Sequence, residues 1–517
     1  MRSYSLFDSV GPIMHGPSSN HTGGAVRLGF YYQKIIGGLP KKIIFLFHPF
    51  LMKFYKGHGT HRALMAGLLG MREDDPNVNH ALHNMQEKGV DIIFQPTHKV
   101  NPDRNLMEIC AVHEGIDWDI HGISVGGGNI VIDKINGLET KITGDTHLYF
   151  YLLKDAIDLK EISEFIDAQD INGYASKQGY FFYISTKFPI EKSVLMRIEK
   201  RVNNIVLKRY VEPLHLFSEK STASPIFRTF SELEQLTVLK DICEVAIDYE
   251  CARSLVTREQ VLNEAIKIVE VEEQAIAKGL MGNISLIGGF VGDSDGRLVA
   301  EYSKTDKTIT GPMFTMAMAR ALAISEISAG GGLIVAAPTC GSAGTLPGII
   351  FSVGERYGAN RETLAKAFLV AAALGTIVAN KSSFSGSIGG CQVEVGVGAA
   401  IGAAASVWLA GGSFKQIKNA FAIAMKNILG LTCDQPVSPV EIPCIKRNAM
   451  GVAVGLMGAE LALAGVESAI PADQVIDALV DTARRIPNEL RCSQIGGLAS
   501  TDIAQELKKK WNEKVQS

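Results

Sequence analysis

The pattern of apolar and polar residues differs between the two halves of the chain. Up to about residue 150, apolar runs of strand length alternate with glycine-rich turns. KKIIFLFH (41–48) and NLMEICAV (105–112) predict strands, HRALMAGLLGM (61–71) a helix, and ISVGGGNIVID (123–133) a glycine-rich turn that opens onto a strand. Residues 1–144 are therefore predicted to form an α+β domain.

The next segment, 145–220, has a different order of elements. Strands are expected at HLYFYLL (147–153), on both sides of the Lys-Gln-Gly turn in GYASKQGYFFYIST (173–186), and at VNNIVLKRYV (202–211). Helices are expected at 159–169 and 191–201. This β-α-β-β-α-β order is that of a ferredoxin-like split βαβ unit. The alternative is that the segment elaborates the first domain.

From residue 231 onward the pattern is helical. Residues 231–254 and 257–280 are long amphipathic stretches with capping-type starts, and residues 215–230 before them are polar and contain a proline, as in a linker. Residues 395–414 carry no charge and approach membrane-spanning length. Because glycine and alanine dominate them, we interpret them as a buried helix of an all-α domain, 231–510.

Composition narrows the class of protein. A chain of 517 residues is too long for one core, and 46% hydrophobic with 20% charged residues suits a soluble multidomain α+β protein. A formal net charge of −3 argues against a nucleic-acid surface. The first residues lack the apolar core of a signal peptide, so we expect a cytoplasmic protein that does not bind a membrane.

The eight cysteines do not suggest disulfides, because the cytoplasm keeps thiols reduced. Cys110, Cys243 and Cys251 fit buried small residues. Three others stand in glycine- and proline-rich surroundings: Cys391 in GGCQVEVG, Cys433 in GLTCDQPVSP and Cys444 in EIPCIKRNAMG. We expect the last two on one extended loop. Such thiols suit a metal centre, either zinc with an open position or an iron–sulfur cluster.

Several motifs together resemble one enzyme family. APTCGSAGTLPG, GGCQVEVG, GLTCD and VEIPCIKRNAMG resemble the α-domain of the iron–sulfur-dependent L-serine dehydratases. FDSVGPIMHGPSSNHTGGAVRLG, GHGTHRA and SVGGG resemble their β-domain. The resemblance covers residues 5–132 and roughly 280–500, in the order β-domain then α-domain.

The resemblance implies a cofactor and a set of site residues. Cys391, Cys433 and Cys444 correspond to the ligands of a 4Fe–4S cluster with one iron free of protein ligands. His58 corresponds to the base that takes the α-proton, with His21 as the competing candidate. The residues expected to bind the substrate are Ser18, Ser19, Thr22, Ser124, Gly126, Gly127, Gly128, Thr339, Ser342, Arg447 and Asn448.

Four features depart from the family pattern. His61 stands where relatives commonly have an acidic residue, and the chain ends in NEKVQS, without the terminal cysteine that caps the cluster in some members. Cys492 also replaces an acidic residue, which makes it a candidate regulatory thiol or fourth ligand, while Cys340 is expected to pack as a small residue. The segment 145–220 stands where relatives carry an ACT domain, but it lacks the usual early glycine.

The leading hypothesis is a lyase that converts L-serine to pyruvate and ammonia. A second is the same reaction on another β-substituted amino acid, such as cysteine or threonine, and a third is a non-catalytic amino-acid sensor. Pyridoxal phosphate chemistry is disfavoured because no lysine motif suggests a Schiff base. If 145–220 is ACT-like, pairing of its strand edges would give a homodimer.

Overall fold

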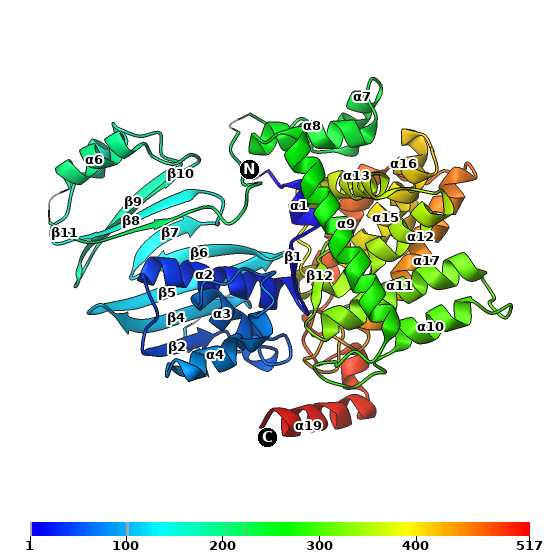
Figure 1. Ribbon diagram of the computed structural model, residues 1–517, viewed down its shortest axis with the longest axis horizontal. Coiled ribbons are helices and arrows are strands. Elements are labelled where there is room, and N and C mark those ends of the chain that lie inside the picture. Colours follow the sequence, from blue (N-terminus) through cyan, green and yellow to red (C-terminus); the bar gives the residue numbers. More distant parts are fainter. Residues whose placement is uncertain (1–2, 100–102, 203, 222, 517) are drawn as a thin grey trace. The chain divides into compact units, whose positions relative to one another are not determined.

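The computed structural model describes residues 3–99, 103–202, 204–221 and 223–516 (Figure 1). The chain divides into two compact units. The helical unit comprises Met1–Ser19, Lys56–Gly59 and Ser221–Ser517, and the sheet unit comprises Asn20–Tyr55 and Thr60–Lys220. The predicted mixture of sheets in the first half and helices in the second is thus confirmed.

A six-stranded sheet with the order β3-β2-β4-β5-β6-β7 forms one part of the sheet unit. Its strands are β2 (Lys42–Phe47), β3 (Asp91–Pro96), β4 (Leu106–His113), β5 (Ile116–Gly126), β6 (Asn129–Ile135) and β7 (Leu138–Ile142). Only the β2–β3 pair is parallel. Helices α2 (Gly24–Ile36), α3 (Thr60–Leu68) and α4 (Ala81–Glu87) cover one face (Figure 1).

A four-stranded antiparallel sheet with the order β11-β8-β10-β9 forms the other part. Its elements follow the split βαβ order: β8 (His147–Leu153), α5 (Leu159–Ser163), β9 (Asp170–Ser176), β10 (Gly179–Thr186), α6 (Lys192–Arg201) and β11 (Ile205–Val211). After its first residue, His147, strand β8 is aromatic or aliphatic and buried because both of its faces are covered. Tyr149 and Tyr151 pack under α6, whereas Phe150 joins Trp118 in the core of the larger sheet.

Two predicted helices differ in length from the observed ones. The helix expected over 159–169 ends at Ser163, and the helix expected over 231–254 is two helices, α7 (Phe230–Thr237) and α8 (Ile242–Ser254). Asp241 begins α8 because its side chain accepts a hydrogen bond from the Cys243 amide at 2.8 Å. Leu239, in the break, is 89% exposed.

The helical unit is built around α15 (Val395–Leu409), which packs against α12, α13, α16 and α17. The helices that follow α8 in this unit, besides α15, are α9 (Arg258–Met281), α10 (Asp295–Ser303), α11 (Pro312–Ala329), α12 (Thr345–Arg356), α13 (Arg361–Ala379), α14 (Gly386–Gly389), α16 (Phe414–Lys426), α17 (Cys444–Leu463), α18 (Ala472–Arg485) and α19 (Asp502–Gln516). The segments Arg361–Ala379 and Cys391–Leu409 are long and apolar enough to span a membrane, but each is 83% buried within the protein.

The helical unit also contains a short sheet. Strand β1 (Ile13–His15) pairs antiparallel with β12 (Leu333–Val335), so the second half of the chain is not purely helical. Before β1, the backbone amide of Leu6, in helix α1 (Leu6–Ser9), donates a hydrogen bond to Glu250 at 2.7 Å. The first residues of the chain therefore pack with the helices.

Candidate functional site

Three thiols predicted as ligands gather in the helical unit. Cys391 opens the turn η5 (Cys391–Val393) just before α15, and Cys433 forms an isolated parallel bridge with Arg491. Cys444 is not on an extended loop as predicted, because it is the first residue of α17. Gly390 precedes Cys391 with φ +75°, and a Cβ there would lie 2.7 Å from the Leu431 carbonyl oxygen, so this sharp entry requires glycine.

A fourth thiol lies in the same group. The Sγ atoms of Cys433 and Cys492 are 2.7 Å apart. Cys391, Cys433 and Cys444 are 4%, 5% and 9% exposed. A hydrogen bond with Cys433, together with burial, raises the pKa of Cys391, and burial raises the pKa of Cys444. The thiols hold their protons in the metal-free protein, so metal binding must displace them.

Arg447 provides a positive charge beside the thiols. Its Nη1 donates to Cys391 Sγ at 3.5 Å and to the Thr432 carbonyl at 2.8 Å, and its Nη2 pairs with Asp434 at 2.7 Å. Burial alone would lower the pKa of Arg447, but Cys391 and Asp434 raise it. The guanidinium therefore remains charged and can stabilise a thiolate at Cys391.

Glu394 is a site residue to which the sequence analysis assigned no role. Glu394 is a partly buried residue. Its carboxylate accepts a hydrogen bond from the Gly386 amide at 2.8 Å and another from Thr339, and desolvation raises its pKa to about 7. A Cβ at Gly386 would lie 2.5 Å from Glu394 Oε1 and 3.6 Å from Cys433 Sγ. The sequence feature that could have revealed Glu394 is its position as a lone acidic residue in an apolar, Gly/Ala-rich segment.

The predicted residues around Thr339 form a braced turn. Thr339 caps η4 (Cys340–Ser342) with Ser342 as the reciprocal partner. Asn448 accepts from the Thr345 amide at 3.0 Å and donates to the Gly341 carbonyl at 2.9 Å. The amide of Asn448 thus ties this turn to α17. Cys340 is packed against Met14, with 3.5 Å between their sulfur atoms.

His58 lies in the segment Lys56–Gly59, which belongs to the helical unit. It is buried, at 5% exposure. A Cβ at the preceding Gly57 would overlap Ser438 Oγ. The loop of His58 therefore packs against the loop between Cys433 and Cys444. Ser18 and Ser19 belong to the same unit.

The other predicted residues gather in the sheet unit. His21 Nε2 is 2.9 Å from Asn105 Oδ1, and Asn105 donates to the Ser124 carbonyl at 3.0 Å. Burial lowers the pKa of His21. Thr22 also belongs to this unit. The three glycines after Val125 have positive φ angles: Gly126 (+123°), Gly127 (+59°) and Gly128 (+82°).

Arg27 is a second residue that the sequence analysis missed. It forms a buried ion pair with Glu73 at 2.7 Å and donates to the Gly128 carbonyl at 2.9 Å. It therefore fixes one end of the glycine turn. His61 Nδ1, in contrast, is 3.2 Å from the Tyr55 carbonyl oxygen, a local contact within the sheet unit.

Glu108, Asp119 and His121 place three potential metal-binding atoms within 4.8 Å of one another. Lys99 Nζ lies 2.6 Å from Glu108 Oε1 and 3.6 Å from Asp119 Oδ2. Burial opposes charge on His121, but bonds with Asp119 and Glu108 raise its pKa to about 9. Lys99 and the protonated His121 therefore balance the two carboxylates.

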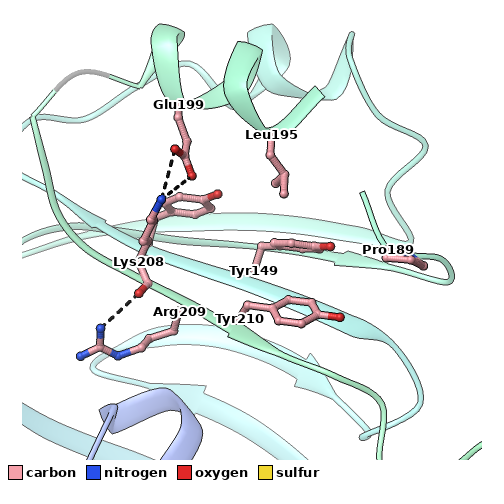
Figure 2. Close-up of a pocket in the computed structure, with 8 residues that line it drawn as sticks. Tyr149, Pro189, Leu195, Glu199, Lys208, Arg209 and Tyr210 are labelled. Carbon is pink, nitrogen blue, oxygen red and sulfur yellow. Dashed lines mark hydrogen bonds and ion pairs between the residues drawn. The ribbon is translucent and has the colours of Figure 1, made fainter. Parts of the chain in front are cut away.

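A pocket of about 460 Å³ lies between α6 and the four-stranded sheet. Figure 2 shows the rings of Tyr149 and Tyr210 side by side, with Leu195 and Glu199 reaching down from α6. Lys208 Nζ donates to Glu199 at 3.0 Å. The pocket thus has an aromatic wall with one charged pair at its end.

Comparison with known proteins identifies the family. The family model described as serine dehydratase alpha chain matches residues 231–499. The probable L-serine dehydratase alpha chain of Bacillus subtilis is 42% identical over 287 residues, which are 55% of this chain and 95% of the relative. The L-serine dehydratase alpha chain of Peptoniphilus asaccharolyticus is 34% identical over 272 residues, 52% of this chain and 91% of the relative. The probable beta chain of the B. subtilis enzyme is 38% identical over 145 residues, 28% of this chain and 66% of the relative. The chain therefore belongs to the serine dehydratase alpha chain family.

Proposed function

We propose that this protein is an L-serine dehydratase, which converts L-serine to pyruvate and ammonia by β-elimination. The names of its relatives support the substrate. The observation that carries the proposal is the buried group of thiols formed by Cys391, Cys433 and Cys444 beside the charged Arg447. This arrangement suits a cofactor with soft ligands and argues against a non-catalytic sensor.

The proposed cofactor is a 4Fe–4S cluster held by Cys391, Cys433 and Cys444. The residues fit it: Cys391 and Cys433 are hydrogen-bonded, Cys444 interacts electrostatically with Cys391, and Arg447 donates to one sulfur. Glycine stands at positions 386 and 390, where a side chain would collide with neighbouring protein atoms. When bound, an iron without a protein ligand is a Lewis acid that favours departure of the substrate hydroxyl group.

The chain supplies the other half of the elimination. His58 takes the α-proton, because a neutral imidazole accepts a proton near neutral pH. Thr339, Ser342, Ser18 and Ser19 are proposed to bind the substrate, while Arg447 orients Cys391. Asn448 acts indirectly, since its amide holds the turn of Thr339 against α17.

The residues of the sheet unit are proposed to recognise the substrate. His21 is oriented by Asn105, which in turn is bonded to Ser124. Thr22 belongs with them. The backbone amides of the glycine turn Gly126–Gly128 are proposed to bind the substrate carboxylate, and Arg27 holds this turn in place.

The segment 145–220 is proposed to be an ACT-like unit that forms a homodimer. At one edge of its sheet, β9 lies beside β7, and the Asn172 side-chain Nδ2 donates to the Glu139 carbonyl at 3.0 Å. At the other edge stands β11, where Val206 and Tyr210 are 49% and 48% exposed. An exposed edge of this kind can pair with a second copy. The tyrosine-lined pocket beside β11 is the proposed place for a regulatory ligand.

We propose a cytoplasmic location without membrane or nucleic-acid binding. Both apolar helices of membrane-spanning length are mostly buried among other helices, and the formal net charge is −3.

Anaerobic purification tests the function. We expect a brown protein that contains iron and acid-labile sulfide and forms pyruvate from L-serine faster than from L-cysteine, with 2-oxobutyrate from L-threonine assayed in parallel. Preference for one of these other amino acids would replace serine as the substrate but keep the mechanism. A colourless protein with stoichiometric zinc would contradict the cluster.

A further inference from the structure

Cys433 and Cys492 form a close pair of thiols that the proposed cluster does not explain. Their 2.7 Å separation is shorter than a non-bonded sulfur contact and longer than the ~2.05 Å of a disulfide bond. Cys433 is one of the three proposed ligands, whereas Cys492 is not, so this contact joins a ligand thiol to a spare thiol. The two free thiols are therefore close enough to form a disulfide bond after only a small movement.

The backbone holds the two cysteines together. The Cys433 amide donates to the Leu490 carbonyl at 2.9 Å, and the Cys492 amide donates to the Cys433 carbonyl at 2.6 Å. Cys492 has φ +53°, a left-handed conformation that cysteine rarely adopts. Further along, the Leu498 amide donates to Asp434 Oδ2 at 3.0 Å. Backbone hydrogen bonds before and after the two cysteines therefore hold their segments side by side.

The two thiols differ in accessibility. Cys433 is 5% exposed, whereas Cys492 is partly exposed. Cys492 is thus the more exposed of the two residues, and we expect a small oxidant to react there first. Cys433 lies immediately behind it and can attack the sulfur of Cys492 once that sulfur is activated.

We propose that Cys433 and Cys492 form a disulfide when the cluster is absent, by exchange with a low-molecular-weight disulfide, and that this bond blocks cluster assembly until it is reduced. The consequence for assembly rests on the proposed role of Cys433 as a ligand. The Cys492 thiolate attacks one sulfur of the small disulfide, forming a mixed disulfide and releasing one thiol. The Cys433 thiolate then attacks Cys492 Sγ and releases the second thiol. Two protein thiols are oxidised, one small disulfide is reduced, and the two cysteine protons end on the released thiols.

Peptide mapping tests the bond itself. The full-length chain is stripped of metal by a chelator under reducing conditions, incubated with glutathione disulfide, alkylated and digested without reduction. We expect a Cys433–Cys492 cross-link and two fewer alkylated cysteines. Cys492→Ser should remove the link, and Cys251→Ser, a matched control, should keep it. A dominant link to Cys391 or Cys444, or no internal link, would overturn the proposal.

Iron uptake tests the consequence. In anaerobic reconstitution without a dithiol, the oxidised wild type should take up at least about tenfold less iron and sulfide than Cys492→Ser treated in the same way, and dithiothreitol should restore the uptake. If the link forms and uptake is unchanged, the block is wrong, and Cys433 is not a required ligand. If no link forms but Cys433→Ala abolishes uptake, the proposed ligand set stands and the redox inference fails.

Discussion

The backbone of Gly57 lies against Ser438, so closely that a Cβ at Gly57 would overlap Ser438 Oγ and lie 2.7 Å from the Pro439 nitrogen. Gly57 precedes His58, and Ser438 lies between Cys433 and Cys444. The loop of the proposed base is thus packed on the loop that joins two proposed ligands.

Gly57→Ala should therefore displace His58 without removing a chemical group. We expect kcat/KM for L-serine to fall by about 10²-fold, because a misplacement of about 1 Å can have this effect, while iron content stays at the wild-type level. Gly292→Ala is the control, since its Cβ would meet only the movable Asp295 carboxylate, at 2.9 Å. Wild-type activity in Gly57→Ala would show that this contact does not position the base.

Replacement of Cys391, Cys433 or Cys444 by alanine should remove both the cluster absorbance and the activity. Each variant lacks one of the three thiolate ligands, and the two that remain are too few to retain the cluster. Cys110→Ala should retain both, because Cys110 lies on β4 in the sheet unit. The visible spectrum and the iron assay are the measurements. Full turnover in a variant that lacks all three cysteines would refute the mechanism.

His58→Ala should lower turnover by at least about 10²-fold while leaving the cluster intact, because it removes the general base. Exchange of the substrate α-proton with deuterated solvent separates this role from substrate binding. His21→Ala is the comparison, with the larger effect expected on KM. Exchange at the wild-type rate in His58→Ala would transfer the role of base to His21.

The sequence was most informative where a motif occupies one short segment. The motifs around Cys391, Cys433 and Cys444 were enough to propose their thiols as ligands, and the apolar runs predicted the strands. The contact between Cys433 and Cys492 could not, because 58 residues separate the two positions and only the backbone pairing of Cys433 with Arg491 brings them together. Arg27 was missed for a similar reason: its partners Glu73 and Gly128 come from distant segments.

Element boundaries depended on details that periodicity does not record. Residues 231–254 read as one amphipathic helix, but the Asp241 cap starts a new one. Similarly, the pairing of β1 with β12 joins residues more than 300 positions apart, so neither strand had a local partner that could reveal it.

The Arg27–Glu73 pair should make the stability of the sheet unit sensitive to acid. Burial alone would raise the pKa of Glu73, but the Arg27 guanidinium lowers it from 4.5 to about 2. The contribution to stability is complete above pH 4.5 and is lost as the pH falls towards 2. Glu73→Gln should cost about 3 kcal/mol at neutral pH and lose less stability than the wild type between pH 5 and 3, as followed by thermal unfolding. The control is Glu87→Gln, whose side chain is 65% exposed. An unchanged acid profile in Glu73→Gln would exclude this pair as the cause.

A charge placed on β11 should separate the proposed dimer. The charged residues of this strand are already paired, Lys208 with Glu199 at 3.0 Å and Arg209 with Glu114 at 2.6 Å, so they do not oppose a second strand. Val206, 49% exposed, offers an uncharged position on the same edge. Val206→Glu in both copies would place like charges near each other at the pairing edge, which destabilises strand pairing. We expect sedimentation to show a shift from dimer to monomer with unchanged iron content.

Val112→Glu, at a 61% exposed valine on β4, is the matched control and should remain dimeric. A dimer of undiminished stability in Val206→Glu would place the interface elsewhere.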